Sequence, residues 1–138
     1  MNTDKNNTQL PQSSVMQSVI FRNELRIGNY IQDYYKTKVL IVENVDSTLN
    51  YKEINNVHSS NHITNLKQIE ICREWLIKLG YEQKGSFYRF KNSRFAEVII
   101  HDEGIEVCVH SVALKHIKYI HQLQNLYFSL TATELTVA

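Results

Sequence analysis

The stretch "FAEVIIHDEGIEVCVHS", residues 95–111, places the strongest constraint on the fold. Two apolar runs rich in β-branched residues are joined through "HDEG", and this pattern predicts an antiparallel hairpin. Gly104 can supply the left-handed residue that closes a type I turn with a bulge. The preceding segment "SFYRFKN" is a third strand by the same criteria, which makes the region a meander. The expected strands are about 86–91, 95–101 and 104–110.

A second β-rich region precedes the hairpin. It is rich in Tyr, Ile and Val, and its turn residues are Gly28-Asn29 and the segment 44–47. We predict antiparallel strands at about 28–34, 37–43 and 49–54. The polar segment 55–65 is predicted to be a loop.

The segment "LKQIEICREWLIKLGY", residues 66–81, has two interpretations. Its apolar residues fall at helical spacing, whereas Ile69 and Ile71 alternate as in a short strand. We favour an extended piece up to Ile71, followed by a helix of about 72–79 that ends at Gly80. This helix is expected to bury Trp75, Leu76 and Leu79.

The segment "YIHQLQNLYFSLT", residues 119–131, forms the main part of a C-terminal helix. The helix is expected to begin near Ile117 or Lys118 and to end near Leu130. Its predicted apolar stripe is Ile120, Leu123, Tyr127 and Leu130, broadened by Tyr119 and Leu126. Gln124 borders this stripe and needs a hydrogen-bond partner if it is covered. His121 is interpreted as structural, and Thr131 with Glu134 resembles a capping box that starts a last short turn.

The chain has 138 residues, the length of one domain of ordinary size. Residues 1–18 are mostly Asn, Gln, Ser and Thr and are predicted to be a flexible polar leader. Residues 19–138 are predicted to form a single α+β domain. The expected fold is a twisted antiparallel sheet, a meander or a small open barrel, with a short middle helix and a C-terminal helix packed on it.

The charge balance and the two cysteines indicate which partners and which cellular compartment to expect. The 15 Lys and Arg nearly balance the 14 Asp and Glu, so binding to nucleic acid or to an anionic membrane requires a local patch. Cys72 and Cys108 lie in apolar patterns and are interpreted as free buried thiols, with a disulfide as the alternative. Without a secretory signal or an apolar span of about 20 residues, the expected location is the cytoplasm, with no membrane contact.

No pattern in the chain indicates catalysis. His58 and His62 lack the glutamate of a zinc-protease motif, and the spacings of His110, His116 and His121 put no two of them on one helical face. There is no C-x-x-C pair, no G-x-S-x-G elbow and no Gly-rich phosphate loop. The acids of the hairpin project from a turn without a cleft, which favours a solvated tip over a metal site. We therefore expect a protein that is not an enzyme and has no cofactor or metal.

The segment "KGSFYRFKNSR", residues 84–94, is the best candidate contact surface. Its basic residues are Lys84, Arg89, Lys91 and Arg94, and its aromatic residues include Phe87 and Tyr88. Basic groups beside strand aromatics suit single-stranded DNA or RNA. The alternative is that Phe87 and Phe90 serve the core, although a regular strand cannot place both on one face. The acids Asp102, Glu103 and Glu106 follow, so the predicted surface is dipolar and also suits a protein or nucleoprotein partner.

Three segments resemble a group of small, uncharacterised proteins that are common in phages and prophages of Bacteroidota. They are "LRIGNYI" at 25–31, "REWLIKLGYE" at 73–82 and "IKYIHQLQNLYFSLTATEL" at 117–135. The last motif is long and specific. The chain departs from it at 132–135, where members usually have Gly before a final Glu-Glu-Leu.

The resemblance implies a mobile-element accessory protein without catalytic residues. Some members of this type are candidates for anti-CRISPR proteins that act on RNA-guided effectors. The expected function is therefore a non-catalytic inhibitor that binds a host protein or nucleoprotein complex of bacterial defence. The alternative is a single-stranded nucleic-acid-binding or RNA-binding accessory protein without an inhibitory role.

Overall fold

The computed structural model describes residues 24–36, 38–45, 50–54, 66–91 and 95–137. The chain divides into two compact units, residues 1–68 and residues 69–138. The leader predicted for residues 1–18 and the loop predicted for 55–65 lie outside the described residues. The range 19–138 includes parts of both units, and its being one domain stays a prediction.

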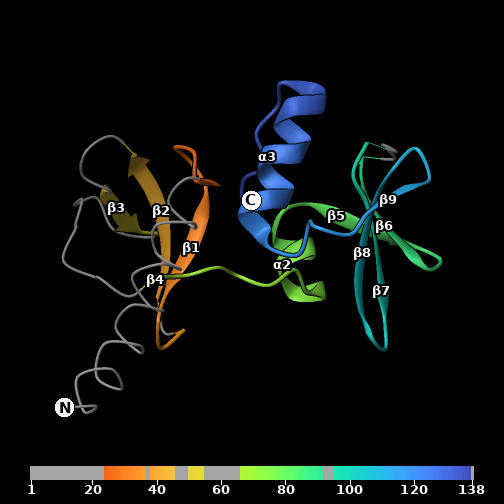
Figure 1. Ribbon diagram of the computed structural model, residues 1–138, viewed down its shortest axis with the longest axis horizontal. Coiled ribbons are helices and arrows are strands. Elements are labelled where there is room, and N and C mark those ends of the chain that lie inside the picture. Colours follow the sequence, from red (N-terminus) through yellow and green to blue (C-terminus); the bar gives the residue numbers. More distant parts are fainter. Residues whose placement is uncertain (1–23, 37, 46–49, 55–65, 92–94, 138) are drawn as a thin grey trace, which may run out of the picture. The chain divides into compact units, whose positions relative to one another are not determined.

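The first unit contains a four-stranded antiparallel sheet with the strand order β3-β2-β1-β4 (Figure 1). Its strands are β1 (Tyr30–Asp33), β2 (Val39–Asn44), β3 (Asn50–Glu53) and β4 (Leu66–Lys67). The first three confirm the predicted strands, and β4 is the start of the extended piece predicted before Ile71. Side chains alternate across a strand, so one face forms the core of the unit. The most deeply buried members of this core are Ile31, Leu40, Val42 and Tyr51.

The second unit contains a five-stranded antiparallel meander in the order β5-β6-β7-β8-β9 (Figure 1). Its strands are β5 (Tyr81–Lys84), β6 (Phe87–Phe90), β7 (Glu97–His101), β8 (Gly104–Val109) and β9 (Val112–Leu114). The middle three confirm the predicted meander, and β5 and β9 extend it on both sides. His101 pairs with Gly104, so the β7–β8 loop has two residues and is tighter than the bulged turn that was predicted.

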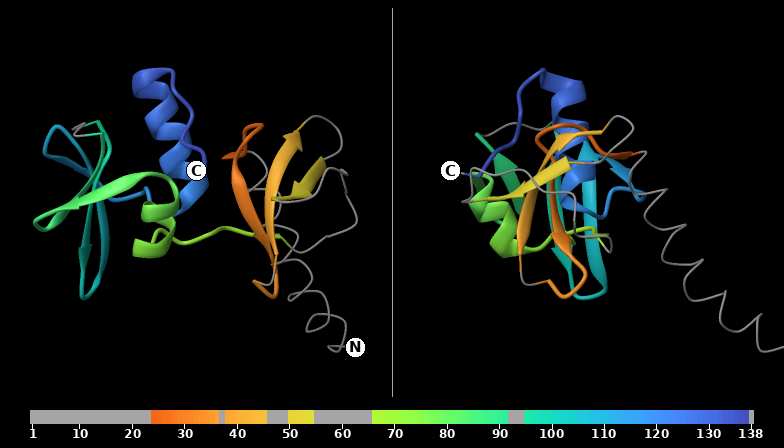
Figure 2. Two further views of the ribbon diagram at one scale, coloured as in Figure 1. Left: turned by 180° about the vertical axis from the view of Figure 1, so that it is seen from behind. Right: turned by 90° about the vertical axis from the view of Figure 1, so that its left-hand side faces the viewer.

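Two helices of the second unit lie on the same side of this sheet (Figures 1 and 2). They are α2 (Arg73–Lys78) and α3 (Ile120–Thr131). Helix α2 confirms the predicted helix, and Gly80 ends it with a φ of 92°. A Cβ atom on Gly80 would lie 3.1 Å from the Phe90 ring, so a larger residue would also require that ring to shift by a few tenths of an ångström. The rings of Phe90 and Tyr127 have centroids 5.3 Å apart, which confirms that α3 packs on the sheet.

Helix α3 begins at Ile120, two to three residues later than predicted, because the preceding residues are extended. The Ile71 N–H donates to the Lys118 carbonyl at 3.1 Å, and the Ile120 N–H donates to the Ile69 carbonyl at 2.8 Å. These bonds pair residues 118–120 with residues 69–71 as a short antiparallel ladder. The Gln122 side chain then accepts a hydrogen bond from the Lys118 N–H at 2.8 Å and caps the helix start.

The buried face of α3 differs in part from the predicted stripe. Ile120, Leu123 and Tyr127 are buried as predicted, whereas Leu130 is 39% exposed and that part of the prediction is wrong. His121 and Gln124 are fully buried and turn the covered face away from Leu130.

The segment after α3 explains the burial of Gln124. Its amide Nε2 donates to the Leu135 carbonyl at 3.0 Å, which confirms the predicted need for a partner. Thr131 does not cap a further helix. Its hydroxyl donates to the Tyr127 carbonyl at 2.8 Å, and within the described residues 132–137 no helical turn follows. The predicted capping box of Thr131 and Glu134 is therefore wrong.

The predicted α+β class is confirmed, with a difference in how the strands associate. They form two open antiparallel sheets in place of one, and neither sheet closes into a barrel. In the described ranges, no helix combines the length and the apolar character needed to cross a membrane.

Candidate binding groove and predicted contact surface

Strand β6 carries the basic and aromatic residues that were predicted to contact a partner. Its side chains alternate between the two faces of the sheet. Tyr88 is 6% exposed and Phe90 stacks on Tyr81, so both belong to the buried face. Phe87 and Arg89 share the opposite face, where the Arg89 guanidinium lies 5.3 Å from the centre of the Phe87 ring. The expectation that Phe87 and Phe90 occupy different faces is confirmed.

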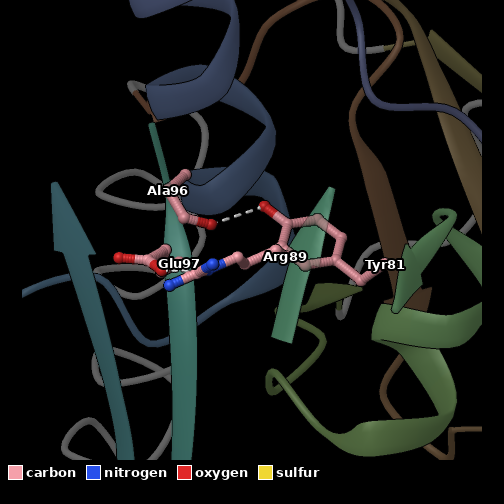
Figure 3. A network of polar contacts seen from close by, with 4 residues as sticks. All are labelled: Tyr81, Arg89, Ala96 and Glu97. Atoms are coloured by element: carbon pink, nitrogen blue, oxygen red, sulfur yellow. Dashed lines mark hydrogen bonds and ion pairs between the residues drawn. The ribbon is translucent and has the colours of Figure 1, made fainter. Parts of the chain in front are cut away.

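Arg89 is already engaged with an acid. Its Nε donates to Oε2 of Glu97, which lies opposite on β7, and the Glu97 side chain is only 4% exposed (Figure 3). The Tyr81 hydroxyl donates to the Ala96 carbonyl at 2.9 Å in the same region (Figure 3). Burial raises the pKa of Tyr81 far above its usual range. Arg89 therefore supports the sheet, and its charge is compensated before any partner binds.

The other predicted cations have weaker partners. Lys84 Nζ lies 3.9 Å from Oε2 of Glu82 in an exposed ion pair. Lys91 Nζ lies 5.1 Å from the centre of the Phe90 ring. Arg94 lies outside the described residues. Among the cations that the structure describes here, Lys91 is the one that no carboxylate neutralises in a salt bridge.

The predicted acids lie along the β7–β8 hairpin. Asp102 and Glu103 are exposed at its turn, and Glu106 is half-buried. Oε1 of Glu106 lies 3.5 Å from Sγ of Cys108, which donates to it. Burial, and then the contact with Glu106, raise the pKa of the Cys108 thiol. The predicted contact residues therefore differ in whether a partner can reach them. Tyr88 is in the core, and Arg89 is paired with Glu97. Asp102 and Glu103 are exposed and can face a partner.

The hairpin turn borders an open groove of about 980 Å³ in the second unit. One wall is the hairpin, from Ile100 to Glu106. The other wall consists of the segments 70–73 and 115–119, which the 69–71 and 118–120 ladder holds together. The apolar lining residues include Ile71, Ile100, Ile105 and Tyr119, and Ile100 is 38% exposed. The groove therefore offers exposed apolar surface between two fixed walls.

Charge is divided between the two walls. Asp102 and Glu103 stand on the hairpin, and Lys115 and Lys118 stand on the opposite wall. All four are exposed, and none forms a salt bridge with another residue of the described ranges. Glu70 and Arg73 add one charge of each sign at the rim. A ligand in this groove meets an acidic side and a largely basic side.

Cys72 is a free, half-buried thiol in the same groove. Burial is the main reason that its pKa is raised, and its hydrogen bond to Glu74 acts in the same direction. The thiol is therefore protonated at neutral pH and is a poor nucleophile. Its place in the groove favours a packing role beside Ile71.

The histidines are dispersed. His101 is exposed at the groove, His110 contacts the Phe95 ring edge-on, and His121 stacks on Tyr119 with ring centroids 6.2 Å apart. His58 and His62 lie outside the described residues. Within the part of the chain that the structure describes, no three His, Cys, Asp or Glu side chains come together as a metal site would require.

The basic wall of the groove was not predicted as part of the contact surface. Lys118 was considered as a possible start of the C-terminal helix, and Lys115 was part of no motif. The signal was the paired lysines in "LKHIKY", placed between a strand and a helix where both side chains must be outside the core. Which surface they face depends on the ladder between 69–71 and 118–120, which joins segments about 50 residues apart.

No protein-family model, curated protein or solved structure matches the chain.

Proposed function

We propose that this protein is a non-catalytic binding protein whose partner is another protein, and that the groove beside the β7–β8 hairpin holds a segment of that partner. The observation that carries the proposal is the division of charge between the walls. Asp102 and Glu103 line the groove from the hairpin, and Lys115 and Lys118 line it from the segment between β9 and α3.

The chemistry of the groove favours a polypeptide over a nucleic acid. A phosphate backbone would be repelled by the acids of the hairpin, whereas a peptide can carry both charge signs and an apolar side chain between them. The four charges have no intramolecular salt bridge to break within the described ranges. Complementary charges on a partner would therefore add binding energy and speed association.

The predicted strand surface supports nucleic-acid binding less than its composition suggested. Arg89 is held by Glu97, and Lys84 is beside Glu82. Each pair reduces the positive potential that phosphates require. The groove, rather than β6, is the surface of the second unit that we assign to a partner.

Within this function, the specific role that we propose is inhibition of a host defence complex, such as an RNA-guided effector. This role rests on the resemblance of three segments to phage and prophage proteins of Bacteroidota. A binding protein with a groove lined by charged and apolar residues is suited to such a role, because inhibition by occlusion needs no catalysis.

The test is capture of a partner from a nuclease-treated Bacteroidota lysate. The double variant Asp102→Lys, Glu103→Lys and the double variant Lys115→Glu, Lys118→Glu each reverse one wall. We expect each to lower the amount of captured protein about tenfold, since reversed charges cost on the order of 1.4 kcal/mol or more. The same variants should lose protection in an assay of plasmid interference by the captured complex.

Lys84→Glu is the matched control, because Lys84 is an exposed lysine of the same unit outside the groove. It should capture the partner like the unmodified protein. Full capture by both double variants would rule out the groove. Capture that disappears on nuclease treatment would rule out a protein as the direct partner.

A further inference from the structure

The turn between β1 and β2 exposes two aromatic rings in the first unit. Tyr34 is 53% exposed and Tyr35 is 80% exposed. Their rings meet edge to face, with centroids 5.4 Å apart and planes at 86°. The two adjacent rings form one exposed aromatic patch, and Tyr35 leaves most of its surface to solvent.

The backbone of this turn is held in place by Asp33. Oδ1 of Asp33 accepts a hydrogen bond from the Lys38 N–H at 2.7 Å, and the Asp33 carbonyl accepts one from the Lys36 N–H at 3.0 Å. The Asp33 N–H donates to the Lys38 carbonyl at 3.2 Å. Asp33 is 8% exposed, so its carboxylate is directed into the turn rather than toward solvent. The exposed rings are therefore carried on an ordered support.

Two lysines flank the rings. Lys67, from β4, places Nζ 5.3 Å from the centre of the Tyr34 ring. Lys36 is exposed in a left-handed conformation with a φ of 60°. Neither forms a salt bridge in the described ranges, whereas nearby Lys38 is 3.3 Å from Glu53. The local surface is thus aromatic and cationic.

We propose that Tyr34, Tyr35, Lys36 and Lys67 form a contact site for single-stranded nucleic acid. The exposed ring of Tyr35 offers a platform on which a base can stack, and Lys36 and Lys67 can each neutralise a phosphate. Single strands fit better than a duplex because their bases are available for stacking. The site is independent of the groove and of its proposed protein partner.

The test uses the purified full-length protein with labelled oligouridylate and oligothymidylate of about ten nucleotides, within the usual site size for single strands. Fluorescence anisotropy should show binding to at least one of them at low salt. Two phosphate contacts predict a log-log salt slope of about −1.4. Tyr35→Ala should weaken binding about 5- to 150-fold, and Tyr35→Phe should retain it, because the ring supplies the stacking.

The lysine variants separate this site from strand β6. Lys36→Gln and Lys67→Gln should each reduce the salt slope by about 0.7, whereas Lys84→Gln and Lys91→Gln should leave it unchanged. Binding of neither oligonucleotide would overturn the proposal, as would a slope that depends on Lys84 and Lys91. If Tyr35→Ala instead reduces capture of the protein partner while no oligonucleotide binds, the turn is a protein contact and the proposal is wrong.

Because this assay contains no partner protein, its failure leaves the groove untouched. Equal affinity for a duplex of the same length would also overturn the proposal, since stacking on Tyr35 would then play no part. Circular dichroism of each variant should match the unmodified protein, because all four side chains lie outside the core of the first unit.

Discussion

Strand β6 and the β1–β2 turn have similar composition and opposite surroundings. Both place aromatic residues next to lysine or arginine, as "FYRFK" and "YYK". Strand β6 lies between β5 and β7, so each of its side chains meets a neighbour: Tyr88 is buried and Arg89 pairs with Glu97. The β1–β2 turn lies beyond the paired residues of β1 and β2, and its rings remain exposed, although Lys67 of β4 approaches the Tyr34 ring. Position in the sheet, rather than composition, decides which aromatic and basic residues are available to a partner.

The largest expected effect comes from removing one ring from each region. Tyr88→Ala should lower the free energy of unfolding by about 3–5 kcal/mol, because it leaves a cavity in the face covered by α3. Tyr35→Ala should change it by less than about 0.5 kcal/mol, because the ring is 80% exposed. Urea denaturation followed by circular dichroism measures both.

The proposed difference between β6 and the β1–β2 turn is wrong if these two variants lower the free energy of unfolding equally. A large loss in Tyr35→Ala would mean that the turn serves the core of the first unit, and its exposed ring would then have a structural explanation. A small loss in Tyr88→Ala would return β6 to the candidate contact surfaces.

A smaller loss of stability is expected from removing the positive charge of Arg89 in β6. Arg89→Met should lower the free energy of unfolding by about 2–3 kcal/mol, because the Glu97 carboxylate is then left buried without its partner. The value is at the low end for a buried pair because the Arg89 side chain is 24% exposed. Lys84→Met is the control and should cost under about 1 kcal/mol, since its ion pair with Glu82 is exposed.

The double variant Arg89→Met, Glu97→Leu sharpens this result. Replacing both partners should restore most of the loss, because no buried charge remains. If the double variant is no more stable than Arg89→Met, the cost arises from lost packing of the arginine stem on Phe87.

Local patterns were sufficient for much of the fold. Alternating β-branched residues predicted the meander, and Gly80 predicted the end of α2. Gln124 was expected to need a partner and has one in the Leu135 carbonyl. The first two features depend on residues close in sequence, where backbone preference and side-chain periodicity act directly, whereas periodicity showed only that Gln124 needs a partner and not which one.

Features that depend on distant segments were missed. The start of α3 was placed too early because the ladder with residues 69–71 takes Lys118 and Tyr119 into an extended conformation. Leu130 was predicted to be buried because a helical stripe alone does not show that His121 and Gln124 are covered instead. The division into two sheets follows from pairing between strands, which periodicity does not determine.

The candidate site was predictable only in part. Asp102 and Glu103 were identified as contact residues and do border the groove, but Lys115 and Lys118 reach it through tertiary pairing. Tyr34 and Tyr35 were not identified as contact residues, because the sequence does not show that the turn after β1 leaves both rings exposed.

A smaller loss than that of Arg89→Met is expected from Tyr81→Phe, which removes one hydrogen bond, from Tyr81 to the Ala96 carbonyl. At neutral pH it should lower the free energy of unfolding by about 1 kcal/mol, because the buried Ala96 carbonyl loses its donor.

The same variant has a pH signature that packing alone would not produce. Burial raises the pKa of Tyr81 above its ordinary value of 10.0, so above that pH the unfolded chain releases a proton that the folded protein retains. Stability is therefore lost as pH rises, by up to about 1.4 kcal/mol per pH unit for this group. Tyr127, whose pKa is also raised by burial, adds a loss of the same sign.

Urea denaturation at neutral pH and at about pH 11 should show a smaller loss of stability in Tyr81→Phe than in the unmodified protein. Equal losses in both proteins would mean that the Tyr81 hydroxyl is accessible to water. The covered face of β6 would then be more exposed to solvent than its contrast with the β1–β2 turn requires.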